Sequence, residues 1–343
     1  MSIKLCTLVM VITCATGILP VGGCNPKSES NTKNAAVKPT IVSKRNLSQI
    51  KVGYCSPSLN ASFYVALAKA VKANAESYGM QFISADGQGD ITRQITGIED
   101  MVAKGVKILI INPLDYKALV STVNAATQAG VAVFILDSYI DPAAHYVSSV
   151  FANNTLNGEL VGEWVADKMA GKKINAAIIS GNQGNQAGKE KRLGFMSGLA
   201  EGQLRTQGKT DFNIISQGWG GWANNEGLKA MEDILSAHPG INVLMAENDA
   251  MAIGALRAVK ELGKETNIMV VGFDGQKEAL KLIRQDKYGA AALNSPDRLG
   301  KLVVESAVRY LNGDKYLDKV MYTQSVLIDK NNVNQFYDEK AAF

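Results

Sequence analysis

The sequence predicts an α/β protein built from two successive lobes, each of them a parallel sheet covered by helices. Short apolar runs alternate with stretches in which apolar residues recur at helical spacing. Two of the runs, 106–111 and 131–136, are continuously apolar apart from Lys107, which is typical of strands buried on both faces of a sheet. The alternation begins again near residue 154, and this restart is the reason to expect two lobes.

The expected elements follow in chain order. The first lobe should contain strands at 50–55, 80–84, 106–111 and 131–136, with helices at 62–78, 91–104 and 115–129. The second should contain strands at 176–179, 213–216, 243–246, 269–272 and 290–293, with helices at 188–204, 224–237, 250–262 and 277–285. A last helix at 297–312 and a strand at 321–328 complete the chain.

The late helix needs a sheet to cover, so we predict that the tail of the chain crosses back to the first lobe. This prediction assigns residues 47–153 and 295–322 to an N-terminal lobe. Residues 154–294 and 323–343 then form a C-terminal lobe, and several strands connect the two.

The first 24 residues have the features of a secretory signal. Lys4 precedes an apolar run at 5–19 that is too short to span a bilayer comfortably. The segment 21–24, VGGC, resembles a lipobox, in which Cys24 would be acylated and would anchor the protein outside the cytoplasm. An ordinary cleaved signal and an uncleaved anchor are the alternatives. Residues 25–46 are polar and are expected to form a flexible stalk.

Composition narrows the possible functions. Hydrophobic residues make up 46% of the chain and charged residues 20%, which is ordinary for a globular protein. The net charge of +4 is small for this length and does not favour a nucleic-acid partner. Cys55 is the one cysteine outside the signal and the lipobox, so we expect no intrachain disulfide. His145 and His238 lack metal-ligand spacing, and no nucleophile–base pair or cofactor fingerprint is visible, so we expect no metal, no cofactor and no enzyme.

Sheets of this kind bind ligands at the carboxyl ends of their strands. The residues that follow the predicted strands are aromatic rings together with Asn, Asp, Glu and Ser. They are Ser56, Ser58, Asn60, Phe63, Tyr64, Asp137, Ser138, Tyr139, Trp219, Trp222, Glu247, Asn248, Asp249, Phe273, Asp274 and Asn294. Rings can stack on the C–H faces of a sugar while carboxylates and amides bind its hydroxyls. The pattern therefore favours a sugar or polyol ligand.

Four well-spaced segments carry a family resemblance: KILIINPLD at 107–115, AENDAMAIGALRA at 246–258, VVGFDG at 270–275 and NSPDRLG at 294–300. Together they resemble the type I periplasmic binding proteins, and among these the ribose-binding-like members, over about residues 51 to 328. The resemblance implies two Rossmann-like lobes joined by a three-strand hinge. It also implies a monomer that closes on a monosaccharide or polyol and delivers it to an ABC permease.

The resemblance also assigns roles to individual residues. Phe63 and Tyr64 would lie against one face of the sugar ring, with only one of the two fully facing it, and Trp222 would lie against the other face. Lys191 stands where the family usually has Arg, and Arg192 is the alternative if the local alignment shifts by one residue. The remaining predicted contacts are Asp137, with two hydroxyls, and Asn60, Ser138, Asn248, Asp274 and Asn294.

Several positions depart from the ribose-binding pattern. Ser138 replaces an Arg, Ala61 replaces an Asn, and Asn294 is shorter than the usual Gln. These changes remove or shorten polar side chains, so we expect a ligand that is larger or less polar than ribose.

Other readings of these residues stay open from the sequence. Asp137 and Asp274 could equally be helix N-caps, Trp219 is expected to be structural or at the rim, and Asp249 is expected to cap the helix that follows it. A sugar sensor that presents its ligand to a chemoreceptor or membrane sensor kinase is the alternative function. A sugar-responsive repressor is rejected, because a signal and stalk stand where its DNA-binding head would be.

Overall fold

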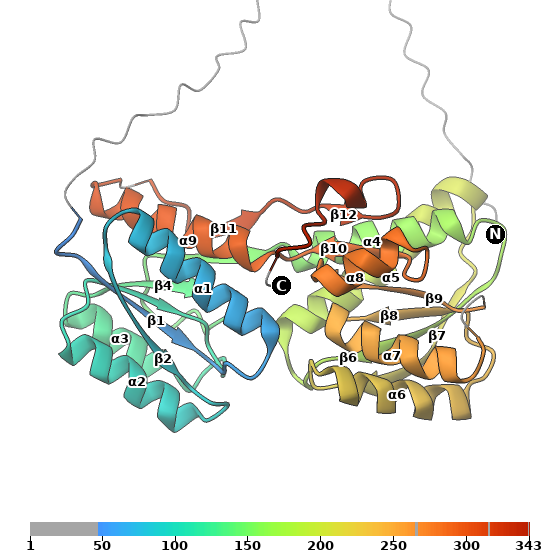
Figure 1. Ribbon diagram of the computed structural model, residues 1–343, viewed down its shortest axis with the longest axis horizontal. Helices are drawn as coiled ribbons and strands as arrows, with labels where there is room; N and C mark the ends of the chain where they lie inside the picture. Colours follow the sequence, from blue (N-terminus) through green and yellow to red (C-terminus); the bar gives the residue numbers. More distant parts are fainter. Residues whose placement is uncertain (1–46, 265–266, 315, 342) are drawn as a thin grey trace, which may run out of the picture. The chain divides into compact units, whose positions relative to one another are not determined.

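The computed structural model describes residues 47–264, 267–314, 316–341 and 343 (Figure 1). The predicted signal, the lipobox at Cys24 and the stalk fall on residues 1–46 and therefore lie outside the described residues. Within the described ranges, no helix has the length and apolar character needed to cross a membrane.

The first sheet has six strands in the order β11-β5-β4-β3-β1-β2, and every neighbouring pair is parallel. Its strands are β1 Lys51–Ser56, β2 Gln81–Asp86, β3 Ile108–Ile111, β4 Ala132–Leu136, β5 Ser148–Ala152 and β11 Val320–Thr323. Its helices are α1 Ser62–Ser77, α2 Ile91–Ala103, α3 Val120–Gln128 and α9 Pro296–Leu311. Apolar clusters fill the space between the sheet and the helices on both faces, with α1 and α9 on one face and α2 and α3 on the other (Figure 1). We call this sheet with its helices the N-terminal lobe.

The second sheet also has six strands, in the order β12-β10-β9-β8-β6-β7, and only β12 runs antiparallel to its neighbour. Its strands are β6 Ile174–Ser180, β7 Phe212–Trp219, β8 Val243–Ala246, β9 Met269–Asp274, β10 Ala290–Leu293 and β12 Leu327–Ile328. Its helices are α4 Asn154–Lys168, α5 Gln186–Gln207, α6 Asn224–Ala237, α7 Asp249–Glu261 and α8 Lys277–Arg284, and a 3-10 turn follows at Val333–Gln335. We call this sheet with its helices the C-terminal lobe.

The predicted α/β class with two parallel-dominated sheets is confirmed. The chain passes between the sheets three times, after β5, after β10 and after β11. The strand expected at 321–328 is in fact two strands, and each of them belongs to a different sheet. The exact lobe boundaries given above stay a prediction.

The sequence patterns did not identify β5 and α4. β5 begins with Ser148 and Ser149, and these buried hydroxyls donate to the backbone oxygens of Asp318 and Lys319, next to β11. Because these buried serines find hydrogen-bond partners elsewhere in the fold, β5 can begin with polar residues. It therefore lacks the continuous apolar run by which a buried strand is predicted from sequence.

α4 lacks a strong apolar stripe because its partner helix approaches it through glycines. A Cβ on Gly158 or Gly162 would overlap the backbone of α5, and one on Gly194 or Gly198 would overlap the backbone of α4. The two helices therefore meet backbone to backbone, and this packing leaves little amphipathic signal in the sequence.

Candidate functional site

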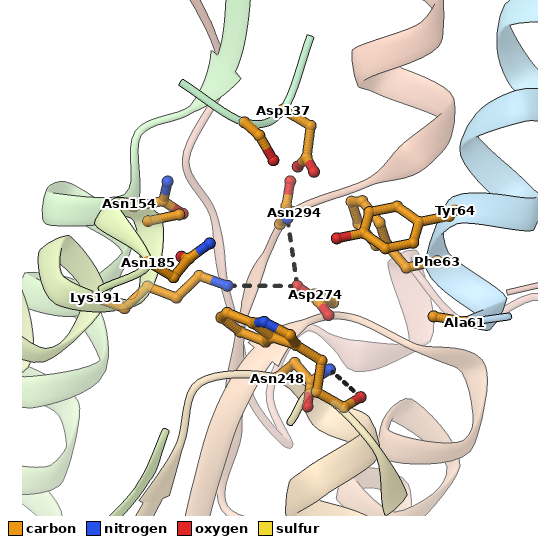
Figure 2. Close-up of a pocket in the computed structure, with 13 residues that line it drawn as sticks. Ala61, Phe63, Tyr64, Asp137, Asn154, Asn185, Lys191, Asn248, Asp274 and Asn294 are labelled. Atoms are coloured by element: carbon orange, nitrogen blue, oxygen red, sulfur yellow. Dashed lines mark hydrogen bonds and ion pairs between the residues drawn. The ribbon is translucent and has the colours of Figure 1, made fainter. Parts of the chain in front are cut away.

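A cavity lies where the carboxyl ends of strands from the two sheets face each other (Figure 2). Its lining combines three aromatic rings, three charged groups and several amides. The lining residues are Ala61, Phe63, Tyr64, Asp137, Ser138, Asn154, Asn185, Ala187, Lys191, Trp222, Asn248, Asp274 and Asn294. Within the described residues, no group of three or more His, Cys, Asp or Glu side chains is placed to hold a metal ion.

Three lining residues have an unusual backbone. Asp137, Trp222 and Asp274 have positive φ angles of 64°, 65° and 108°, a region that side-chain-bearing residues rarely adopt. Such conformations cost on the order of 1–3 kcal/mol each and cluster at functional sites. Of the five non-glycine residues with positive φ in the described part of the chain, these three line the cavity.

Asp137 directly follows β4 and is the acceptor that the N-terminal lobe contributes. Its carboxylate accepts a hydrogen bond from Nδ2 of Asn112 at 3.2 Å, and Asn112 is completely buried behind it. Loss of contact with bulk water raises the pKa of Asp137, and the nearby Lys191 ammonium opposes this increase. The carboxylate has free lone pairs and can accept further hydrogen bonds from a ligand.

Asp274 ends β9 and is the corresponding acceptor of the C-terminal lobe. Nζ of Lys191 lies 3.7 Å from its Oδ1, and Nδ2 of Asn294 donates to the same oxygen at 3.3 Å (Figure 2). Burial raises the pKa of Asp274 to about 8, against the opposing effect of Lys191. Oδ1 of Asn294 is buried and has no hydrogen-bond partner, so it can accept a hydrogen bond from a ligand hydroxyl.

The structure distinguishes Lys191 from Arg192. Lys191 lines the cavity, donates to the backbone oxygen of Glu247 at 2.8 Å and lies 5.6 Å from the centre of the Trp222 ring. Arg192 is not a lining residue and forms an ion pair with the buried carboxylate of Glu247. The two residues are adjacent on α5 and face different sides of it.

The aromatic residues lie on both sides of the cavity. Phe63 and Tyr64 come from the first turn of α1, and their rings meet edge to face at 5.8 Å. Figure 2 shows the hydroxyl of Tyr64 directed into the cavity. Trp222 lines the cavity from the C-terminal lobe, in the loop between β7 and α6. Burial raises the pKa of Tyr64, which therefore stays a neutral hydrogen-bonding group.

The expected capping role of Asp249 is wrong. The α7 N-cap is Asn248, whose Oδ1 accepts from the backbone N–H of Met251 at 2.9 Å while its Nδ2 donates to the backbone oxygen of Trp222. Asp249 is fully buried and accepts three hydrogen bonds, from the backbone N–H groups of Gly275 and Gln276 and from the hydroxyl of Tyr288. It therefore fixes the turn that presents Asp274, and burial raises its own pKa to about 7.

Of the predicted contacts, Asn60 is not brought to the cavity. Its side chain is exposed, its backbone N–H donates to Oγ of Ser58, and the neighbouring Ala61 lines the cavity instead. Trp219, expected to be structural or at the rim, is 44% exposed and is not a lining residue.

Asn154, Asn185 and Ala187 line the cavity but were absent from the sequence prediction. Asn154 opens α4, which the periodicity did not reveal, so it had no strand end to mark it. Asn185 caps α5 by accepting from the backbone N–H of Gly188 at 2.9 Å. Its place after β6 and just before a helix is the signal that could have identified it.

The chain matches the family described as the periplasmic binding protein domain over residues 52–315. It is 34% identical to the ribose import binding protein of Bacillus subtilis over 79% of this chain and 84% of that protein. It is 30% identical to the ribose import binding protein of Escherichia coli over 85% of this chain and 95% of that protein.

Among solved structures, the chain is similar to an ABC transporter solute-binding protein from Mycobacterium smegmatis with bound glycerol. The TM-score is 0.77 at 30% identity, and the match covers 85% of this chain and 98% of that chain. The family match and the shared architecture confirm the resemblance drawn from the four sequence segments. The chain therefore belongs to the periplasmic binding protein family, among its type I, ribose-binding-like members.

Proposed function

We propose that this protein captures a monosaccharide or polyol between its two lobes and delivers it to an ABC importer. One observation carries the proposal: the cavity at the facing strand ends combines aromatic rings with hydrogen-bonding groups that are already oriented. The relatives named as ribose import binding proteins support the same ligand class and the same role.

The chemistry of the lining suits a neutral polyhydroxylated ligand. Asp137, Asp274 and Oδ1 of Asn294 are acceptors for hydroxyl protons, and the Lys191 ammonium is a donor for a ring or hydroxyl oxygen. Phe63 and Tyr64 on one side and Trp222 on the other provide surfaces for the C–H faces of a ring. Neither set of groups alone would select a sugar over another polar or apolar molecule.

Binding residues on both lobes provide a reason for closure. A ligand shifts a conformational equilibrium only by its differential affinity for the two states, and a ligand that contacts both lobes has more contacts when they approach each other. The bound form is then distinct from the empty form, and this difference allows a permease to select the loaded protein.

We also propose that the protein works outside the cytoplasm as a lipoprotein anchored through Cys24. The support is the sequence of the first 24 residues together with the polar stretch at 25–46, which would separate the anchor from the binding lobes.

A thermal-shift screen of pentoses, hexoses and polyols tests the proposed ligand class. A ligand that binds only the folded state raises the melting temperature, by an amount that grows with its concentration relative to Kd. We expect at least one neutral sugar or polyol to give a saturable shift in the wild type and a much smaller one in Asp137→Ala. No shift with any member of the panel would contradict the proposal.

Transport is tested separately from binding. The loaded protein should stimulate ATP hydrolysis by a cognate sugar ABC importer when both are reconstituted. Binding without stimulation, together with a response from a chemoreceptor or sensor kinase, would favour the sensory role instead.

A further inference from the structure

We propose that Gly181 is a positioning residue for ligand recognition, because it forms the surface on which the Trp222 ring is fixed. The inference rests on the proposed function, in which Trp222 stacks on the ligand. Gly181 itself follows β6 and does not line the cavity. Its role is to determine where the ring lies.

The Trp222 ring lies directly on the backbone of Gly181. A Cβ added to Gly181 would overlap the Cε2, Cζ2 and Cδ2 atoms of the indole. An indole is rigid and cannot move aside as the end of a flexible chain can, so any side chain at position 181 must displace the whole ring. The backbone of Gly181 is outside the left-handed region, so the limit on this position is space rather than conformation.

The backbone around Trp222 is held on both sides. The N–H groups of Gly220 and Gly221 donate to the backbone oxygens of Ser180 and Gly181, at 2.7 Å and 3.2 Å. Nδ2 of Asn248 donates to the backbone oxygen of Trp222 at 3.1 Å. With its backbone fixed, Trp222 can respond to a larger residue at 181 only by rotating its side chain away from the position it now has.

Gly181 is in turn held by a buried ion pair. Its N–H donates to Oε2 of Glu247 at 2.8 Å, and Glu247 is completely buried. Arg192 donates to Oε1 of the same carboxylate and to Oγ of Ser180 at 3.2 Å. The backbone oxygen of Glu247 accepts from Nζ of Lys191 at 2.8 Å, so one residue orients both the cation of the site and the support of the ring. Buried ion pairs contribute little net stability, and fixing a geometry is the better account of this one.

A double-mutant cycle tests this role. The variants are Gly181→Ala, Trp222→Ala and the double substitution, with Gly240→Ala as the matched control. Gly240 lies in the same lobe, and a Cβ added there meets no atom within 4 Å. Melting temperatures are measured without ligand, and affinities are measured by calorimetry with D-ribose, D-allose and myo-inositol.

We expect Gly181→Ala and Trp222→Ala each to weaken binding by about 10- to 100-fold, because both remove the stacking surface. Adding Gly181→Ala to Trp222→Ala should have no further effect, since the ring that the new methyl group would displace is gone. Without ligand, Gly181→Ala should lower the melting temperature by a few degrees. The double variant should have the same melting temperature as Trp222→Ala. Gly240→Ala should match the wild type in both measurements.

Wild-type affinity in Gly181→Ala, or independent effects that add in the double variant, would overturn the inference while leaving the binding site intact. If Gly181→Ala does not fold, the double variant decides: recovery of folding supports the contact, and failure of both overturns it. Normal affinity in Trp222→Ala would instead contradict the proposed site. If none of the three ligands binds the wild type, affinities are measured with the ligand that the thermal-shift screen identifies. Melting temperatures that show no coupling between the two substitutions would overturn the inference without any ligand, because the contact itself would then be absent.

Discussion

The two lobes contribute to the cavity in different ways. The N-terminal lobe supplies the rings of Phe63 and Tyr64 and one carboxylate, Asp137, backed by the amide of Asn112. The C-terminal lobe supplies a connected polar surface that includes Lys191 and Asp274. Behind that surface lie charged side chains, buried or partly buried, that do not line the cavity. These supporting residues are Arg192, Glu247 and Asp249.

The two halves of one site are therefore stabilised by different means. The C-terminal half is preorganised, because each of its ligand-facing groups is already held by another group. The N-terminal half presents two rings from the first turn of α1 and one acceptor, Asp137, which is held by a single side-chain hydrogen bond from Asn112. Substitutions in the N-terminal half that keep the backbone conformation and the contact with Asn112, such as Asp137→Asn, should therefore change mainly affinity. Substitutions in the C-terminal half should also change the stability of the empty protein.

The largest loss of affinity is expected for Asp137→Ala. Losing two charge-assisted hydrogen bonds costs on the order of 3 kcal/mol, or about 100-fold in Kd. Ligand-induced compaction should be lost as well, since the N-terminal lobe would keep no charged contact. Calorimetry measures the affinity and small-angle scattering the compaction. The affinity of Asp137→Asn should lie between those of the wild type and Asp137→Ala, because Asn tolerates the positive φ of 64° and keeps one acceptor.

A smaller loss is expected for Trp222→Ala, about 1–3 kcal/mol from ring contact and buried area. In contrast to Asp137→Asn, this variant should also lower the melting temperature of the empty protein, because Trp222 packs on the core of its lobe. Calorimetry and thermal unfolding without ligand separate the two effects. Near-normal affinity in both Trp222→Ala and Asp137→Ala would contradict the assigned site.

The stability of the empty protein should fall as pH rises. The pKa of Asp249 is raised from 3.8 to about 7, and that of Asp274 from 3.8 to about 8. Between pH 4 and pH 8 the folded state therefore binds more protons than the unfolded state, so the free energy of unfolding decreases with increasing pH. The stabilisation is fully present below about pH 4 and is lost as pH passes through 7 to 8.

Melting temperatures across this pH range in Asp274→Asn test the assignment. The decrease should be shallower in Asp274→Asn than in the wild type, whereas Asn in place of the exposed Asp233 should leave it unchanged. An identical slope in Asp274→Asn and the wild type would show that Asp274 is ionised normally in the empty site.

No effect on affinity is expected for Cys24→Ser, which should act only on anchoring. The variant should appear as soluble or unprocessed protein, while its sugar affinity equals that of the wild type. Fractionation after a salt wash measures the retention, and calorimetry on the purified protein measures the affinity. Equal membrane retention of the variant would contradict the lipobox.

The α/β class, most of the strands and helices and the end of each sheet at which a ligand is expected to bind could all be predicted from the sequence alone. These depend on local patterns, because an apolar run or a helical repeat arises from the solvent exposure of neighbouring positions along one element. The polar and aromatic residues at the strand ends could be identified because the strands themselves were predicted from these local patterns. The topology of parallel strands then requires those ends to share one edge.

The role of each member of two adjacent pairs became clear only from the folded structure. Lys191 rather than Arg192 lines it, and Asn248 rather than Asp249 caps α7. In each pair both residues have the right chemistry, and the choice depends on what packs against each side of the helix.

The helix α4 and the strand β5 could be identified only in the folded structure. The glycines of α4 pack against the backbone of α5, and the serines of β5 donate hydrogen bonds to residues next to β11. The contact between Gly181 and the Trp222 ring has the same origin. Gly181 follows β6 and Trp222 follows β7, and the two residues meet only because these strands pair in the folded sheet. A contact between distant segments leaves no periodicity in either of them, and so it can be seen only after the chain has folded.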